Sequence, residues 1–295
     1  MQNDRRHTMK PILSRKITVL SIATIAAISS LAPVDGFATS GLGAMSSVRG
    51  LEMRKRKVVN PAKLSHTQLF AGSNTGVVAG IGEEGCNLPS ISGVNTKDNL
   101  TQALTVKAIF LSLGLGTFLF TTGLGQFAVY LDETFPSQYE FFRNTWPISF
   151  GLIFSLAGIT HFTLKEEYKN IVPTNGSWGV WYIPGSKAFH VAWTGVAELA
   201  GGFGLLTAGI SSFAGNSNLT ALTSAGLESD SAAALFLLVL AVTPANIFMF
   251  THGAKLPMAS EPIPLSFHAV RWVMQVVLLG FLYQMGQDTF QVLLS

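Results

Sequence analysis

The stretch Ala232–Thr251, which reads AAALFLLVLAVTPANIFMFT, is twenty residues long and carries no charged side chain. At 1.5 Å per residue, a helix of this length spans roughly 30 Å, the thickness of the hydrocarbon core of a membrane. Backbone N–H and C=O groups find no water there, so they must pair with each other inside the segment. The stretch therefore predicts an α-helix that crosses a membrane.

Four further apolar stretches bring the predicted number of spans to five. The composition agrees, because 48% of the residues are hydrophobic and 12% are charged, against roughly 25% charged in soluble domains. The predicted fold class is an all-α polytopic membrane helix bundle. The second stretch has two alternatives, an earlier start at Phe141 or a re-entrant or surface helix. The four stretches are Ala108–Tyr130, Ile148–Leu164, Phe189–Phe213 and Phe267–Tyr283.

The ends of these spans carry further signals. Ser266 is the expected N-cap of the last helix, which has a continuation to Leu294 along the membrane surface as its alternative end. Aromatic residues gather at membrane interfaces, so four aromatic side chains at span ends are assigned to interfacial belts. These are Trp146, Trp178, Trp181 and Tyr182.

The positive charge of the chain is concentrated before the first span. Residues 1–71 hold eleven Lys and Arg against three Asp and Glu, whereas residues 72–295 hold eight against thirteen. The sequence pI of about 9.0 therefore comes from this leader and gives no case for a nucleic-acid partner. Cys86 is the single cysteine, which excludes an intramolecular disulfide, a CxxC pair and a multi-cysteine metal site.

The leader has two parts. Residues 1–36 combine basic residues with the apolar run Ile17–Ala32 and are predicted to be a signal peptide, with a signal anchor as the alternative. Residues 37–71 are rich in Ser, Gly, Ala and basic residues, which is typical of a transit peptide. A signal followed by a transit peptide that opens on Phe37 resembles the leaders of algae with complex plastids. Residues 72–107 are predicted to be a flexible polar segment.

Charges in the loops predict the orientation of the bundle. We call side A the side of the membrane that the residues before the first span reach, and side B the opposite side. One basic residue, Arg143, falls on side B, and a bias of this kind marks side A as the compartment from which insertion occurs. In a plastid that compartment is the stroma. Six lysines fall on side A: Lys97, Lys107, Lys165, Lys169, Lys187 and Lys255.

Polar side chains within four of the spans fall in the same half of the predicted bundle. Ionisable groups at this depth cost roughly 2.5–3.5 kcal/mol on insertion scales and indicate function. Three interpretations stay open: a Glu198–Arg271 pair that locks the helices, a ligand pocket, or a metal or haem site, for which no ligand set is assigned. Pro244 is expected to free the carbonyl group of Leu240 and to line a cavity. The cluster comprises His161, Glu198, Asn246, Arg271 and Gln275.

Small residues recur along two of the spans and are expected to permit close helix packing. Because no strand precedes them, the Gly-x-Gly patterns do not indicate nucleotide binding. The residues of the first span are Gly114, Gly116, Gly123 and Gly125, and those of the third are Ala197, Gly201, Gly202 and Gly204.

Three short stretches of the chain resemble the DoxX-like family of small four-helix membrane proteins. They are Ala157–Phe162 (AGITHF), Gly195–Gly202 (GVAELAGG) and Pro244–Met249 (PANIFM), with Arg271 and Gln275 as the polar pair of the last helix. The resemblance covers about residues 147–285. It implies a DoxX-like four-helix domain over residues 147–290, with residues 108–130 as an additional N-terminal transmembrane helix.

The resemblance leaves two functions open. The favoured one is a non-catalytic accessory or assembly factor of a plastid membrane complex, whose partners are the lipid bilayer and other membrane subunits. The alternative is a quinone- or lipophile-binding subunit of an oxidoreductase, with Glu198 or His161 relaying protons. The expected location is a plastid membrane, either thylakoid or inner envelope. The sequence carries no cysteine pair and no flavin or nucleotide motif, so the second function requires a redox partner or a bound cofactor, with quinone as the candidate.

Overall fold

Five long helices form the molecule in the computed structural model, which describes residues 81, 86, 88–214 and 226–295. Each is long and apolar enough to cross a membrane, so the chain is a multi-pass membrane protein. The predicted signal and transit peptides, including Phe37, lie outside the described residues. The helices are α2 (Asn99–Thr134), α3 (Pro136–Thr163), α5 (Lys187–Ala214), α7 (Leu227–His252) and α8 (Leu265–Met285).

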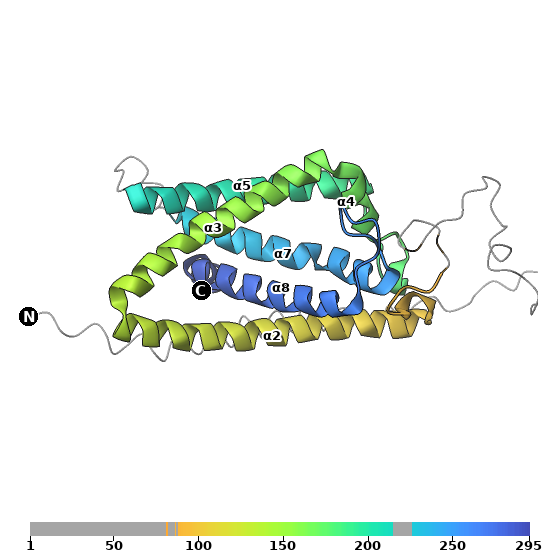
Figure 1. Ribbon diagram of the computed structural model, residues 1–295, viewed down its shortest axis with the longest axis horizontal. Helices are drawn as coiled ribbons and strands as arrows, with labels where there is room; N and C mark the ends of the chain where they lie inside the picture. The colour runs from red at the N-terminus through yellow and green to blue at the C-terminus, as the bar shows by residue number, and fades with distance from the viewer. Residues whose placement is uncertain (1–80, 82–85, 87, 215–225) are drawn as a thin grey trace, which may run out of the picture.

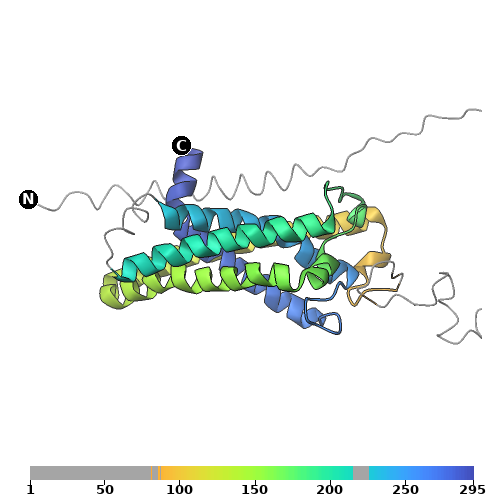
Figure 2. The same cartoon turned by 90° about the horizontal axis from the view of Figure 1, so that it is seen from above.

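Shorter helices lie at the two ends of the bundle. On side A, the 3-10 turn η2 (Val94–Thr96) precedes α2, and α4 (Lys165–Ile171) and η3 (Ser177–Gly179) connect α3 to α5. On side B, α9 (Gln287–Leu294) follows α8. Figure 2 shows α9 turned away from the long axis of the bundle. No strand occurs in the described part of the chain.

The spatial order of the helices differs from their order in the sequence. Helix α2 packs on α8, α8 on α7, α7 on α5 and α5 on α3. Figure 1 shows α3 starting beside the end of α2 and running obliquely until it lies along α5. Near its start α3 meets α8 through aromatic rings, with the Trp146 and Phe281 ring centroids 4.7 Å apart. Towards side A, α3 therefore diverges from α2 and α8.

The first span is longer than its apolar stretch, which corrects the prediction that residues 72–107 are flexible throughout. Helix α2 begins at Asn99 because the Asp98 carboxylate caps it, accepting a hydrogen bond from the Thr101 amide at 3.0 Å. Before the helix, the Ser90 hydroxyl donates to the Thr251 carbonyl at 2.8 Å. The last part of the segment is thus fixed to the end of α7.

Two other helix boundaries also differ from the sequence predictions. Helix α3 starts at Pro136, earlier than Ile148 or Phe141, because proline is favoured in the first helical turn and the helix continues through Pro147. Helix α8 begins at Leu265 after Pro264, so Ser266 is not its N-cap. It ends at Met285 with Gly286 as its C-cap, and α9 is a separate helix. The amide of Thr289 in α9 donates to the Ser229 hydroxyl of α7 at 2.9 Å.

Helices α3 and α5 pack with their backbones almost in contact. A Cβ atom added to Gly158 of α3 would lie 2.9 Å from the carbonyl oxygen of Gly195, and one added to Gly151 would lie 2.9 Å from that of Gly202. In each helix the two glycines are seven residues apart, a spacing that keeps one face of a helix against its neighbour. The close pair α3–α5 forms one wall of the site described below.

Candidate functional site

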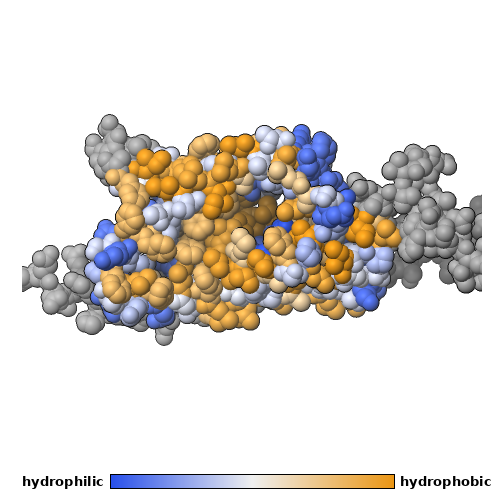
Figure 3. Space-filling model, in the orientation of Figure 1, coloured by the Kyte–Doolittle hydropathy of each residue, from blue (hydrophilic) through white to orange (hydrophobic). Residues whose placement is uncertain are grey.

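A cavity of about 530 Å³ lies in the side-A half of the bundle, between α3, α4 and α5 on one wall and α7 and α8 on the other. Figure 3 shows a hollow in this face of the molecule with mainly apolar residues around it. The volume falls within the roughly 300–1,000 Å³ of sites for small organic ligands. Four residues of the predicted cluster line the cavity: His161, Glu198, Asn246 and Arg271.

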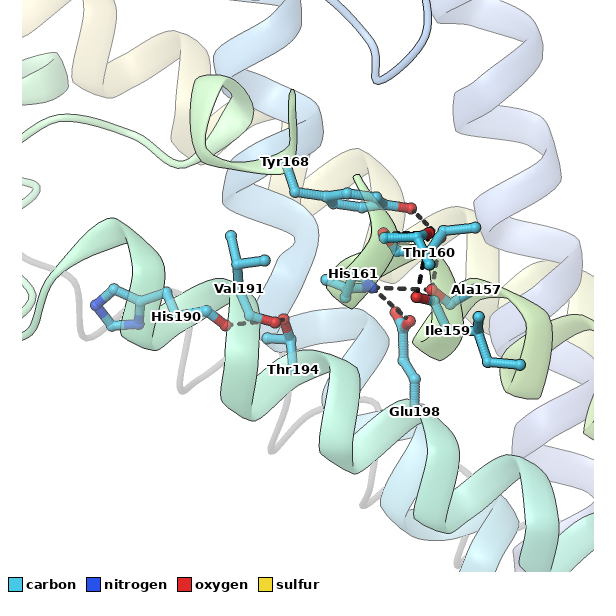
Figure 4. A network of polar contacts seen from close by, with 10 residues as sticks. Ala157, Ile159, Thr160, His161, Tyr168, His190, Val191, Thr194 and Glu198 are labelled. Carbon is cyan, nitrogen blue, oxygen red and sulfur yellow. Dashed lines mark hydrogen bonds and ion pairs between the residues drawn. The ribbon is translucent and has the colours of Figure 1, made fainter. Parts of the chain in front are cut away.

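On the first wall, His161 of α3 faces Glu198 of α5 (Figure 4). Nδ1 of the imidazole lies 3.1 Å from Oε2 of the carboxylate and 3.0 Å from the carbonyl oxygen of Ala157. Nδ1 carries at most one hydrogen and cannot satisfy both acceptors fully, and Oε2 has no aligned hydrogen bond from any described residue. Glu198 is 8% exposed and its Oε2 atom is buried, although the residue is part of the cavity lining.

The close approach of α3 and α5 creates this pair. A Cβ atom at position 195 would lie 2.6 Å from the Cβ atom of His161, so Gly195 leaves the space that the histidine occupies. Glu198 lies one turn further along α5, on the same face. Gly195 therefore allows the His161 imidazole to lie against the buried Glu198 carboxylate.

Helix α4 returns over this pair from side A. The ring of Tyr168 lies 3.9 Å from that of His161 between centroids, and its hydroxyl is 2.8 Å from the Thr160 hydroxyl. Burial raises the pKa of the Tyr168 phenol, and the nearby Glu198 carboxylate raises it further, although the hydrogen bond to Thr160 lowers it. The tyrosine thus stays neutral and covers the His161–Glu198 pair.

On the second wall, α7 and α8 carry a connected polar network. The Arg271 guanidinium donates through Nη2 to Asn246 Oδ1, and through Nη1 to the Met249 sulfur at 3.4 Å. Asn246 Nδ2 donates to Gln275 Oε1 at 3.1 Å. Gln275 in turn donates to the Thr243 hydroxyl at 2.6 Å. Gln275 does not line the cavity. It contributes by accepting the hydrogen bond from Asn246.

The predicted Glu198–Arg271 pair does not form: no ion pair joins these two side chains in the described part of the molecule. The reason is the spatial order of the helices. Because α5 packs on α3 and α7 separates α5 from α8, Glu198 meets His161 and Arg271 meets Asn246 instead. Four of the five predicted residues line one cavity and Gln275 bonds to Asn246, so the five form two separate groups.

Several contributing residues were missed at the sequence level. Thr243 accepts from Gln275 and donates to the Val239 carbonyl at 2.8 Å. Its position directly before the PANIFM stretch was a usable signal in the sequence. Tyr168 lies outside every span and reaches the site only because α4 folds back. Leu240 and Pro244 line the cavity, as expected for the proline of α7.

Two predicted interfacial residues belong to the core instead. Trp146 is 7% exposed. Trp178 is 2% exposed, and its indole N–H donates to the Thr251 hydroxyl at 2.9 Å. This bond satisfies the polar atom of a tryptophan that would otherwise sit at the membrane surface. Tyr182, at 70% exposed, fits the surface position predicted for it. No group of three or more His, Cys, Asp or Glu able to hold a metal occurs in the described ranges.

Comparison with known proteins adds no relative: no protein-family model, no curated protein and no solved structure matches the chain.

Proposed function

We propose that this chain binds a quinone or another small lipophilic molecule in the membrane, as a subunit of an oxidoreductase system. The observation that carries the proposal is the cavity of about 530 Å³, which has apolar walls and a few convergent polar groups. On one wall, free N–H groups of Arg271 can donate to a carbonyl oxygen of the ligand. On the other, Glu198 is part of the cavity lining, and its carboxylate can accept from a ligand hydroxyl.

The His161–Glu198 pair supports a role in proton transfer. A general acid or base must lie within hydrogen-bond reach of the proton it moves, and these two groups are 3.1 Å apart. A carboxylate that faces the ligand and an imidazole behind it can pass a proton when the bound molecule gains or loses one. The electrons would come from a partner protein or a bound cofactor.

The resemblance of residues 147–290 to the DoxX-like family and the two-part leader extend this proposal. We assign the protein to a plastid membrane, with the leader directing it there. Residues 1–71 fused to a fluorescent protein should enter the plastid, and Phe37→Ala should hold the fusion outside it. Secretion of the intact fusion would overturn this location.

The binding function is tested by purifying the full chain in mild detergent and analysing the co-purified lipophiles by absorbance and mass spectrometry. A stoichiometric quinone or other lipophile is the expected result. The double variant Glu198→Gln, Asn246→Leu should lose it, whereas Arg143→Gln, an exposed side-B change, should keep it. A correctly folded protein that retains no lipophile and binds none when quinones are added would contradict the proposal.

A second function, that of an accessory or assembly factor, is favoured by the outer surface of α2. In its most apolar stretch 6% of the residues are buried, against 50% in α7, and Gly114 and Gly123 face open space. Small residues on an exposed helix allow another membrane helix to approach closely. Co-purification of a stoichiometric membrane subunit that is lost in the Gly114→Leu, Gly123→Leu variant would support this role.

A further inference from the structure

Arg271 brings a positive charge into the cavity without a carboxylate to balance it. Its contacts among the described residues are the neutral side chains of Asn246 and Met249. An arginine side chain stays protonated and offers five N–H donors, and these contacts use two of its nitrogens. Charged side chains within membrane spans are normally paired, so the remaining donors indicate an anionic partner that the described part of the chain does not provide.

The guanidinium does not reach to the membrane surface. Long basic side chains near helix ends often extend toward water, but Arg271 instead bonds to Asn246. Asn246 is six residues before the end of α7 at His252, which corresponds to a depth of roughly 9 Å. The charge is therefore held inside the bundle by α7.

Glu198 is the one acidic residue in the cavity lining, and it lies on the opposite wall. Its carboxylate faces His161 at 3.1 Å and has no ion pair with Arg271. The two walls consequently differ: the α3–α5 wall offers a carboxylate and an imidazole, and the α7–α8 wall offers a guanidinium. An anionic group would find its favourable place on the α7–α8 wall.

A second, more polar cavity of about 360 Å³ adjoins the first on side A. The two share five lining residues: Val172, Pro173, Trp181, Ile183 and His190. Among the described residues, the lining of the second cavity also includes Lys187 and includes no Asp or Glu. A charged head group can thus approach from side A through polar surroundings before it reaches Arg271.

We propose that the cavity takes a single-chain amphiphile with an oxyanion head group, a carboxylate or a phosphate. The oxyanion accepts hydrogen bonds from Arg271, and the chain lies against the apolar surface of Leu240, Val242 and Ile171, which line the cavity. Arginine matches such oxygens geometrically, with two parallel hydrogen bonds. This inference rests on the proposed lipophile-binding function and specifies the chemical class of the ligand.

The test measures binding of radiolabelled hexadecanoic acid to the full chain purified in an uncharged detergent. Competitors are its methyl ester, a single-chain lysophosphatidic acid and inorganic phosphate. The acid should compete about 10- to 100-fold better than the ester, as expected for a charge-assisted hydrogen bond. Arg271→Gln should remove this preference, so that acid and ester bind equally, Arg271→Lys should keep part of it, and Arg143→Gln should keep all of it.

The outcomes separate the two proposals. Equal binding of acid and ester, or a preference that survives Arg271→Gln, overturns the oxyanion inference and leaves lipophile binding intact. If neither acid, ester nor quinone binds, the proposed function itself fails. Competition by inorganic phosphate as strong as by hexadecanoic acid would show a site for a soluble anion and overturn the amphiphile. Stronger competition by lysophosphatidic acid than by hexadecanoic acid would support the inference with a phosphate head.

A photoreactive fatty acid keeps the inference testable if Arg271→Gln fails to fold. With the reactive group next to the carboxylate, the wild-type chain should be labelled in the peptides that contain Met249 or Arg271. Labelling of the peptide around Glu198 alone would place the head group on the wrong wall and overturn the inference.

Discussion

Helix pair α3–α5 and helix pair α2–α8 are both rich in glycine, yet their glycines have different roles. In α3–α5, Cβ atoms on Gly151 and Gly158 would collide with backbone atoms of the neighbouring helix. In α2, nothing lies within 4 Å of a Cβ atom on Gly114 or Gly123. Glycine thus permits backbone contact in one pair and, at those two positions of the other, makes no contact within the chain.

In the α2–α8 pair, Gly116 and Gly280 approach side chains of the neighbouring helix and not its backbone, and polar side chains add hydrogen bonds between the helices. The Trp272 indole donates to the Ser112 hydroxyl at 3.2 Å, and Gln284 donates to the Thr121 carbonyl at 3.3 Å. Close backbone packing fixes the relative position of two helices more tightly than contacts between side-chain ends, because side chains can change rotamer. The His161–Glu198 pair lies on α3 and α5, the helices whose relative position is fixed more tightly.

The largest effect is expected for Gly158→Leu. A Cβ atom at this position would lie 2.7 Å from Leu199 Cγ and 2.9 Å from the Gly195 carbonyl oxygen, so the helices must separate. The free energy of unfolding should fall by about 3 kcal/mol, the upper part of the usual range for overpacking. Thermal unfolding in detergent measures it. Gly123→Leu on α2 is the matched control; it meets no neighbour and should not destabilise the protein, with a gain of up to about 1 kcal/mol from helix propensity. Equal losses would remove the distinction between the pairs.

A double-mutant cycle tests which partner Glu198 uses. Because Glu198 contacts His161, Glu198→Gln combined with His161→Leu should show a coupling free energy of about 1–2 kcal/mol. Glu198→Gln combined with Arg271→Gln should be additive within about 0.5 kcal/mol, since no ion pair joins these residues. Coupling in the second cycle and not in the first would mean that the α5–α8 lock exists after all.

Trp272→Phe probes the side-chain contacts of α2–α8. The change removes the indole N–H that bonds to Ser112 and should lower the free energy of unfolding by about 1 kcal/mol, the usual net worth of one hydrogen bond. Ser112→Ala should cause little further loss in this background. Full additivity of the two substitutions would indicate that the bond does not contribute to stability.

The smallest effects should differ in sign between the pairs. Gly114→Ala on α2 meets no neighbour and should stabilise the helix by up to about 1 kcal/mol through helix propensity. Gly202→Ala on α5 should destabilise the protein, because the new Cβ atom would lie 2.7 Å from the Ser155 amide nitrogen. A shift of both melting temperatures in the same direction would contradict the comparison.

The sequence alone determined the class of the protein and the number of its spans. Twenty uncharged residues such as Ala232–Thr251 have one stable backbone arrangement in hydrocarbon, because their N–H and C=O groups can only pair within the segment. Five apolar stretches predicted five helices, and five are found in the described part of the chain. The polar residues inside them could also be singled out as a set, since a polar side chain is conspicuous against an apolar run, and four of the five line one cavity.

Only the tertiary structure decided which of these residues meet. Whether Glu198 contacts His161 or Arg271 depends on the spatial order of α3, α5, α7 and α8, and hydropathy is nearly the same for every order. The roles of Gly158 and Gly123 differ for the same reason, because a glycine permits contact only where another helix lies against it. Trp178 lies in the core and not at the predicted membrane surface, because folding brings Thr251 within hydrogen-bond distance of its indole.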